Sequence, residues 1–142
     1  MSVPMKQYDD FETDINILSG DIVDCAFQVH KELGPGFLEM NYEDAFIYEL
    51  RQKGLSFEQQ KIFKIPYKKD FLNSEFRFDL IVENKILVEL KAVEKIHPVH
   101  KAQIYAYLKA TKLELGLLIN FNVPLIKDGI GRYVLRNSES PR

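Results

Sequence analysis

Apolar residues recur with helical spacing in the first third of the chain. Within SGDIVDCAFQVHKELG, residues 19–34, they form one stripe; Ser19 stands where it can cap the helix, and Gly34 can end it. A second stripe over Leu38–Lys53 predicts another helix that ends at Gly54. The stripes consist of Ile22, Ala26, Val29 and Leu33, and of Leu38, Tyr42, Ala45, Phe46 and Leu50.

The spacing then changes to that of β-strands. Three short segments rich in β-branched and aromatic residues follow one another, KIFKIPY, EFRFDLIVE and KILVELKAV, with the polar stretches KKDFLNS and ENK between them. A helix over Val99–Lys112, an apolar strand LGLLINF and a short strand RYVLR complete the pattern. This order predicts an α/β (α+β) domain with a mixed central sheet flanked by helices.

Composition narrows the class of protein. A chain of 142 residues with 46% hydrophobic content fits a single domain, which we expect over residues 15–136, between a flexible arm at 1–14 and a flexible tail at 137–142. The single cysteine, Cys25, cannot form an internal disulfide, and the polar, acidic start is unlike a signal peptide. Both features predict a reducing, cytoplasmic location. No stretch approaches the roughly 20 apolar residues that span a bilayer, so we expect no membrane insertion.

Charge is distributed unevenly along the chain. The net charge is −2, but residues 1–60 hold 4 Lys/Arg and 12 Asp/Glu, whereas residues 61–142 hold 15 and 9. A polyanion would therefore meet the second part of the chain. Charge counts alone fit a set of solvated faces as well.

The hairpin over Glu75–Val93 has a register that burial can test. If the turn centres on Asn84, one face is wholly apolar, and a shift by one residue would bring charges into it. The pairs are Phe78 with Leu90, Leu80 with Val88 and Val82 with Ile86 on that face, and Ile81 with Leu87, Asp79 with Glu89 and Arg77 with Lys91 on the other.

This register places two carboxylates, Asp79 and Glu89, side by side, with β-carbons about 5 Å apart, which is destabilising unless a cation joins them. Lys91 lies on the same face, and a divalent ion could neutralise the rest. Two acids and a lysine are what metal-assisted phosphodiester cleavage requires. A solvated face with a network of charges explains the same pattern.

Gln103 and Tyr107 lie one turn apart on the following helix, so both can approach the strand ends that carry Glu89 and Lys91. Gln103 could hydrogen-bond a phosphate or the lysine. The alternatives are an exposed polar residue for Gln103 and a core residue for Tyr107.

The order of elements, together with these residues, resembles the PD-(D/E)XK nuclease superfamily. More specific is GPGFLEMNY, which holds Gly36, Glu39 and Tyr42 in a G-x-x-E-x-x-Y pattern, with HKELGPG, ELKAV and GLLINF around it. These motifs resemble the small prokaryotic GxxExxY protein family over roughly Ile17 to Arg136.

The resemblance implies a restriction-endonuclease-like αβββαβ core with an extra N-terminal helix. It implies a Mg²⁺ site, with Mn²⁺ as a substitute, formed by Asp79, Glu89 and Glu39, and Lys91 as the catalytic lysine. Gln103 and Tyr107 match the helix motif of exonuclease-like members, whereas Phe78 stands where the superfamily's name has a proline.

The implied function is a nuclease, a hydrolase that cleaves DNA or RNA with metal-activated water, with a possible protein partner supplying specificity. The alternative is a noncatalytic module of the same fold that binds nucleic acid or protein. Competent residues at every expected catalytic position favour the enzyme. The sequence does not define an oligomeric state.

The remaining chemically active residues suggest structural roles. His97 and His100 in HPVH lack further metal ligands nearby and suit helix capping or phosphate contact better than a metal site. His30 on the first helix has no assigned chemistry, and Cys25 lies beside the apolar stripe, as a small buried residue would.

Overall fold

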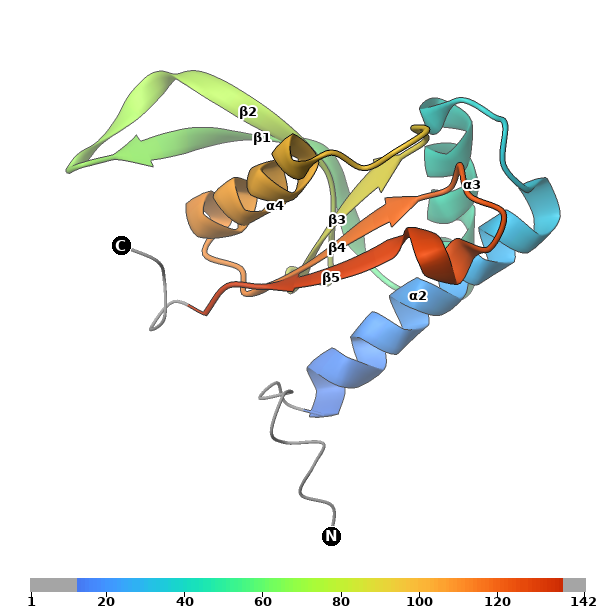
Figure 1. Ribbon diagram of the computed structural model, residues 1–142. Helices are drawn as coiled ribbons and strands as arrows, with labels where there is room; N and C mark the ends of the chain where they lie inside the picture. Colours follow the sequence, from blue (N-terminus) through green and yellow to red (C-terminus); the bar gives the residue numbers. More distant parts are fainter. Residues whose placement is uncertain (1–12, 137–142) are drawn as a thin grey trace, which may run out of the picture.

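The computed structural model describes residues 13–136 (Figure 1). Residues 1–12 of the expected arm and the expected tail at 137–142 lie outside the described residues. The first helix, α2, spans Thr13–Leu33, so residues 13 and 14 belong to it and not to the arm.

Ser19 does not cap a helix, because α2 begins six residues earlier than its position. It lies inside α2 with 4% of its surface exposed, and its hydroxyl accepts a hydrogen bond of 3.1 Å from Arg132 Nη1. The polar group that suggested a helix start instead joins α2 to the far edge of the sheet.

Five strands form one mixed sheet in the order in which they follow along the chain. Strands β3 and β4 pair in parallel, with α4 as the crossover between them, and the other neighbours are antiparallel, which confirms the predicted fold class. The elements after α2 are α3 (Glu39–Gln52), β1 (Phe57–Tyr67), β2 (Asp70–Val82), β3 (Ile86–Lys91), α4 (Pro98–Thr111), β4 (Leu115–Asn120), the 3₁₀ helix η1 (Ile126–Gly129) and β5 (Ile130–Val134).

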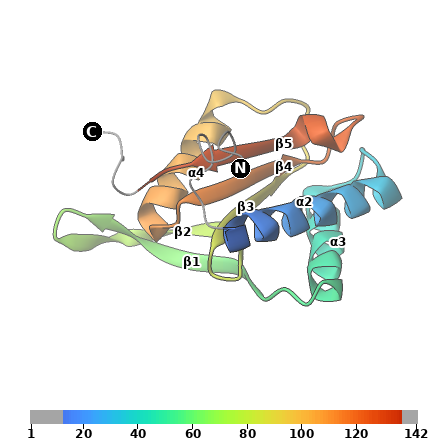
Figure 2. The same cartoon turned by 90° about the horizontal axis from the view of Figure 1, so that it is seen from below.

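Helices cover both faces of the sheet, and each face has its own apolar core (Figures 1 and 2). Helices α2 and α3 pack on one face, where Leu80, Val88 and Leu90 lie among their buried side chains. Helix α4 packs on the other face through Ile104 and Leu108. Because β3 and β4 lie between the two cores, both strands are apolar along almost their whole length.

The predicted hairpin register is confirmed in the three pairs next to the turn, Leu80 with Val88, Ile81 with Leu87 and Val82 with Ile86. Phe78, however, does not share a face with Leu80; it packs beneath α4 with Ile81 and Leu87. The ladder of β1 with β2 skips Gln60 and Asp79, and Gln60 has a φ of +52°. The side-chain alternation therefore changes face at Asp79.

Strands β1 and β2 are longer than the sequence pattern predicts. The polar stretch KKDFLNS is mostly strand, and only Lys68 and Lys69 form the turn. Residues 61–78, which we name the projecting hairpin, extend past the rest of the sheet on the α4 side (Figure 1). Phe63 and Phe76 anchor its base on α4.

Tyr42 holds the junction between α2 and α3. Its hydroxyl donates a hydrogen bond of 2.6 Å to the Gly34 carbonyl and accepts one of 3.1 Å from the Phe37 amide. Its buried ring stacks on Phe121 at 4.6 Å. Gly36 makes the turn at a φ of +113°, which favours glycine. The first and last residues of the G-x-x-E-x-x-Y pattern thus fix where α3, and Glu39 with it, begins.

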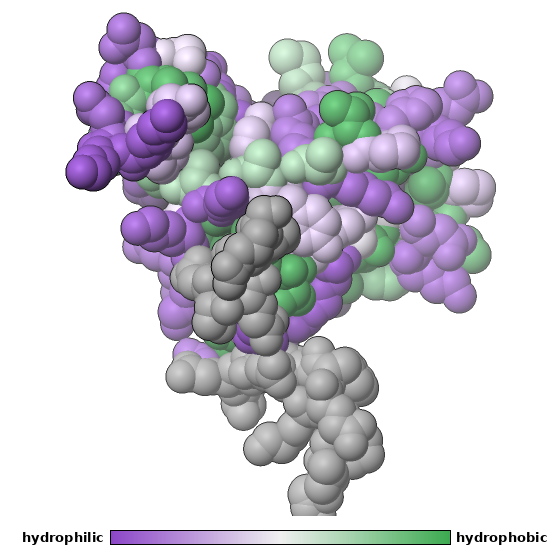
Figure 3. Space-filling model, turned by 60° about the vertical axis from the view of Figure 1, so that its left-hand side comes forward, coloured by the Kyte–Doolittle hydropathy of each residue, from purple (hydrophilic) through white to green (hydrophobic). Residues whose placement is uncertain are grey.

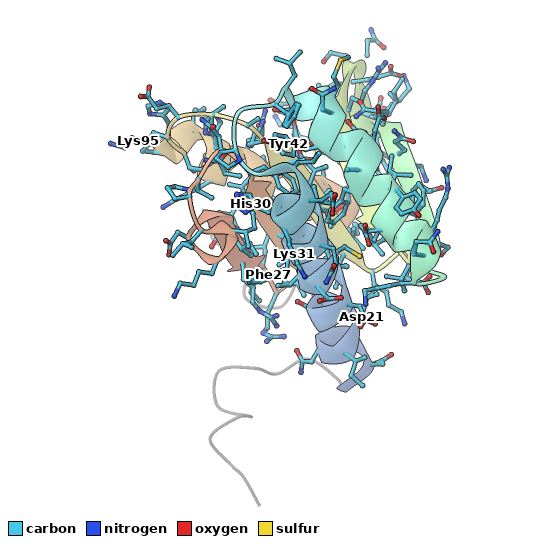
Figure 4. All side chains as sticks on the ribbon, turned by 90° about the vertical axis from the view of Figure 1, so that its right-hand side faces the viewer. Asp21, Phe27, His30, Lys31, Tyr42 and Lys95 are labelled. Atoms are coloured by element: carbon cyan, nitrogen blue, oxygen red, sulfur yellow. The ribbon has the colours of Figure 1, made fainter. Side chains whose placement is uncertain are left out.

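His30 and Cys25 have structural surroundings. His30 Nε2 lies 2.8 Å from the Val123 carbonyl oxygen and ties α2, where Figure 4 labels it, to the loop after β4. Cys25 is fully buried, and burial raises the pKa of its thiol to about 12, so it is not a reactive thiolate.

No helix within residues 13–136 is long and apolar enough to cross a membrane.

Replacing Tyr42 by Phe tests the junction. The change leaves the Gly34 carbonyl without its donor, so we expect a loss of about 1 to 2 kcal/mol in the free energy of unfolding, measured by urea denaturation. Tyr48→Phe is the matched control, because Tyr48 lies on the same helix with 59% exposure; its effect should stay within about 0.5 kcal/mol. Equal stability of the two variants would contradict the role given to Tyr42.

Candidate active site

Two reciprocal hydrogen bonds join Asp79 and Glu89 to the main chain of each other's strand. Glu89 Oε2 accepts a hydrogen bond of 3.0 Å from the Asp79 amide, and Asp79 Oδ2 accepts one of 2.8 Å from the Leu90 amide. They take the place of the β2–β3 ladder, whose last pair on this side is Leu80 with Val88. The carboxylates therefore close the gap where the two strands separate.

Burial makes the negative charge of this pair costly. Burial and, next, the negative charge of Asp79 raise the pKa of Glu89, which is 5% exposed, to about 8. Burial likewise raises the pKa of Asp79, against the lowering effect of the Leu90 amide. Lys91 favours the ionised form of both acids.

Helix α3 brings Glu39 to the same place. Glu39 lies in the first turn of α3 and is exposed. Loss of hydration raises its pKa, the negative charge of Asp79 adds to the effect, and Lys91 opposes it. Glu39 is thus in electrostatic range of Asp79, Glu89 and Lys91.

Helix α4 contributes Tyr107 and Gln103 from the other side. The Tyr107 ring stacks on Phe76 with 4.4 Å between centroids. Its pKa is raised by burial and by the charges of Glu89 and Asp79, and is lowered by a hydrogen bond with Gln103. Tyr107 is therefore in electrostatic range of both acids, and the exposed Gln103 is linked to them only through Tyr107.

Two residues that the sequence analysis missed join this cluster. Gln60 Nε2 donates to Glu43 Oε2 at 3.0 Å and lies 3.5 Å from Asp79 Oδ1. Glu43 follows Glu39 by one helical turn, a spacing that could have been noticed in the sequence. No pattern indicates Gln60, because its position depends on the positive φ within β1.

Asn120 fixes the chain directly after Lys91. It is 3% exposed, its Oδ1 accepts from the Val93 amide at 3.0 Å, and its Nδ2 donates to the Val93 carbonyl at 3.0 Å. Lys91 pairs with Asn120 across β3 and β4, and its carbonyl accepts from the Phe121 amide. These bonds hold the end of β3 in place.

The HPVH histidines form a helix cap. The His97 amide donates to His100 Nδ1 at 3.0 Å at the start of α4, with Pro98 in the first turn. Loss of hydration and the neighbouring Lys91 lower the pKa of His100. Within the described side chains, no group of three or more His, Cys, Asp or Glu is arranged to hold a metal ion, so a site that includes Glu39 stays a prediction.

A comparison with protein families identifies the superfamily of the chain. The model of the PD-(D/E)XK nuclease superfamily matches residues 16–133. The chain belongs to the PD-(D/E)XK nuclease superfamily. No curated protein and no solved structure matched the chain.

Membership in the PD-(D/E)XK superfamily fits the mixed sheet between helices, which is consistent with a restriction-endonuclease-like fold. It supports nuclease function, a nucleic-acid substrate and the use of a divalent metal, which PD-(D/E)XK nucleases generally need. The individual roles of Glu39, Asp79, Glu89, Lys91, Gln103 and Tyr107 stay predictions.

Two substitutions of Asp79 distinguish the effect of its charge on stability from the effect of its hydrogen bond. Asp79→Asn keeps an acceptor for the Leu90 amide and removes charge repulsion, so in chelator it should match wild type or gain about 0.5 to 1 kcal/mol. Asp79→Ala leaves the amide unpaired and should cost about 1 to 3 kcal/mol. Denaturant unfolding of both variants measures the difference; an asparagine variant as unstable as the alanine variant would contradict the argument.

The pKa of Glu89 gives stability a pH dependence. An acid whose pKa is raised by folding stabilises the native state below its unfolded pKa, and this contribution is lost as pH rises through the folded value. We expect the melting temperature of the metal-free protein to fall between about pH 4.5 and 8. Glu89→Gln should flatten this fall, and identical pH profiles for the two proteins would contradict the assignment.

Proposed function

We propose that the protein is a metal-dependent nuclease that hydrolyses phosphodiester bonds of DNA or RNA. The observation that carries this proposal is the pair Asp79 and Glu89, locked to opposite strands by main-chain amides, with Lys91 acting on both charges. A purely structural pair could be replaced by apolar residues without leaving buried charge. Retaining two nearly buried acids beside a lysine fits a chemical role.

The available oxygens suit a hard divalent cation. Asp79 Oδ2 and Glu89 Oε2 are engaged by amides. Asp79 Oδ1 has only the long contact with Gln60, and Glu89 Oε1 has no hydrogen bond to any residue of 14–136. Carboxylate oxygens on a rigid frame are the ligands that Mg²⁺ and Mn²⁺ prefer. Asp79 and Glu89 would hold the ion, with Glu39 joining from α3.

The residues of the site have distinct roles in the proposed hydrolysis. A bound divalent cation supplies a Lewis acid that activates water and offsets phosphate charge. Lys91 orients the attacking water or stabilises the negative charge that develops on the phosphate. Gln103 hydrogen-bonds Tyr107, and its part in the proposed reaction is a hydrogen bond to a phosphate or to Lys91.

The G-x-x-E-x-x-Y pattern supports a finer placement in the GxxExxY family. Gly36 and Tyr42 fix the start of α3, and that helix carries Glu39 into range of Asp79 and Lys91. The pattern therefore links a structural junction to an acid of the proposed site.

Nuclease assays test the proposal. Wild type should cleave a single- or double-stranded substrate in Mg²⁺ or Mn²⁺ and not in chelator, and Lys91→Ala should lower the rate by about 100-fold or more. Lys127→Ala, an exposed lysine on η1, is the control and should cleave like wild type.

Thermal melts provide a readout besides activity. Mg²⁺ should raise the melting temperature of wild type, because a ligand stabilises the state that binds it, and should not raise that of Glu89→Gln. Binding of nucleic acid without metal-dependent cleavage over a broad substrate panel would overturn the nuclease proposal in favour of a noncatalytic binding module.

A further inference from the structure

The projecting hairpin has a charge opposite to that of the protein as a whole. Residues 61–78 carry five basic and two acidic side chains, whereas the whole chain has a net charge of −2. The basic residues are Lys61, Lys64, Lys68, Lys69 and Arg77. A projecting element of this sign attracts polyanions.

Three of these cations have no carboxylate partner in the described part of the chain. Within the described residues, Lys68, Lys69 and Arg77 make no ion pair. Lys61 and Lys64, by contrast, pair with Glu58 at 2.8 Å and Glu75 at 3.7 Å. The positive charge free to meet a ligand is therefore concentrated at the turn and on one strand near the base.

Exposed aromatic rings flank the two lysines of the turn. Tyr67 is 56% exposed and Phe71 is 60% exposed, and Lys68 Nζ lies 5.6 Å from the centre of the Tyr67 ring. Phe71 pairs with Pro66, and Tyr67 pairs with Asp70, so the rings lie on opposite faces of the hairpin. Figure 3 shows the hairpin as a projection whose hydrophilic side chains surround a hydrophobic strip.

The projecting hairpin begins and ends next to Asp79, one of the acids of the candidate site. It begins after Gln60 within β1 and ends before Asp79 within β2, and the side chains of these two residues meet beside Glu43. Its seven-residue first strand segment reaches roughly 20 Å from them. A strand of nucleic acid bound at the tip would therefore be held within about 20 Å of the acids.

We propose that the tip of the projecting hairpin, Tyr67–Phe71, binds a single-stranded segment of nucleic acid; the inference rests on the proposed function for its link to cleavage. Unpaired bases stack on exposed aromatic rings while lysines contact the phosphates, which is how proteins hold single strands. Paired bases offer their faces to no such ring. A second copy of the chain is a poorer occupant, because the tips would bring like charges together.

Binding of labelled oligo(dT) of about 20 nucleotides, measured by fluorescence anisotropy in chelator, tests the proposal without cleavage. Tyr67→Ala and Phe71→Ala should each weaken binding by about tenfold. Lys68→Gln combined with Lys69→Gln should lower the slope of log affinity against log salt by about 1.4, the equivalent of two phosphate contacts.

Matched controls lie on other surfaces. Lys31→Gln with Lys127→Gln removes two exposed lysines that line one pocket at α2 and η1; Figure 4 labels the first of them. Tyr48→Ala removes a ring as exposed as that of Tyr67. Both controls should bind like wild type, and circular dichroism verifies that every variant is folded.

Three results would overturn the proposal. These are wild-type affinity in the hairpin variants, equal losses in the controls, or tighter binding of duplex with no effect of the aromatic substitutions. Loss of a wild-type dimer in Phe71→Ala, with oligo(dT) affinity unchanged, would assign the tip to self-association instead. Binding that depends on the tip, in a protein that cleaves nothing, would uphold this inference and reject the nuclease proposal.

Discussion

The candidate site depends on how two strands separate. Beyond Leu80 and Val88 the main-chain ladder of β2 and β3 stops, and the amides of Asp79 and Leu90 need other acceptors. The carboxylates of Glu89 and Asp79 supply them. Side chains that would otherwise be free to rotate are thereby held by main-chain groups, at the cost of negative charge in a nearly buried place. The raised pKa values of both acids follow from that burial, and Lys91 opposes the rise.

The surrounding elements support that pair from three directions. Tyr42 fixes the start of α3 and so the position of Glu39. Asn120 on β4 holds the chain that follows Lys91. Tyr107 on α4 is oriented by its stacking on Phe76. The acids thus stand on strands and helix ends that are packed into both cores, as a preorganised site requires.

The same break in pairing shapes the projecting hairpin. At Gln60 and Asp79 the alternation of side chains changes face, which turns Phe78 toward α4 and directs the hairpin away from the sheet. Its base is covered by α4, and its tip has basic and aromatic side chains exposed. One irregularity therefore serves both the acids and the surface that we propose for substrate.

The sequence by itself determined the order of elements and the register next to the Asn84 turn, because periodicity and apolar burial act along each segment. That register also indicated Asp79, Glu89 and Lys91 as candidate site residues, whereas Glu39 was indicated only by the resemblance of the G-x-x-E-x-x-Y pattern to a known family. Tertiary structure alone decided the face of Phe78, the length of the hairpin and the places of Gln60 and Asn120. These depend on a positive φ, on helix packing and on hydrogen bonds between residues far apart in the chain, none of which leaves a local pattern.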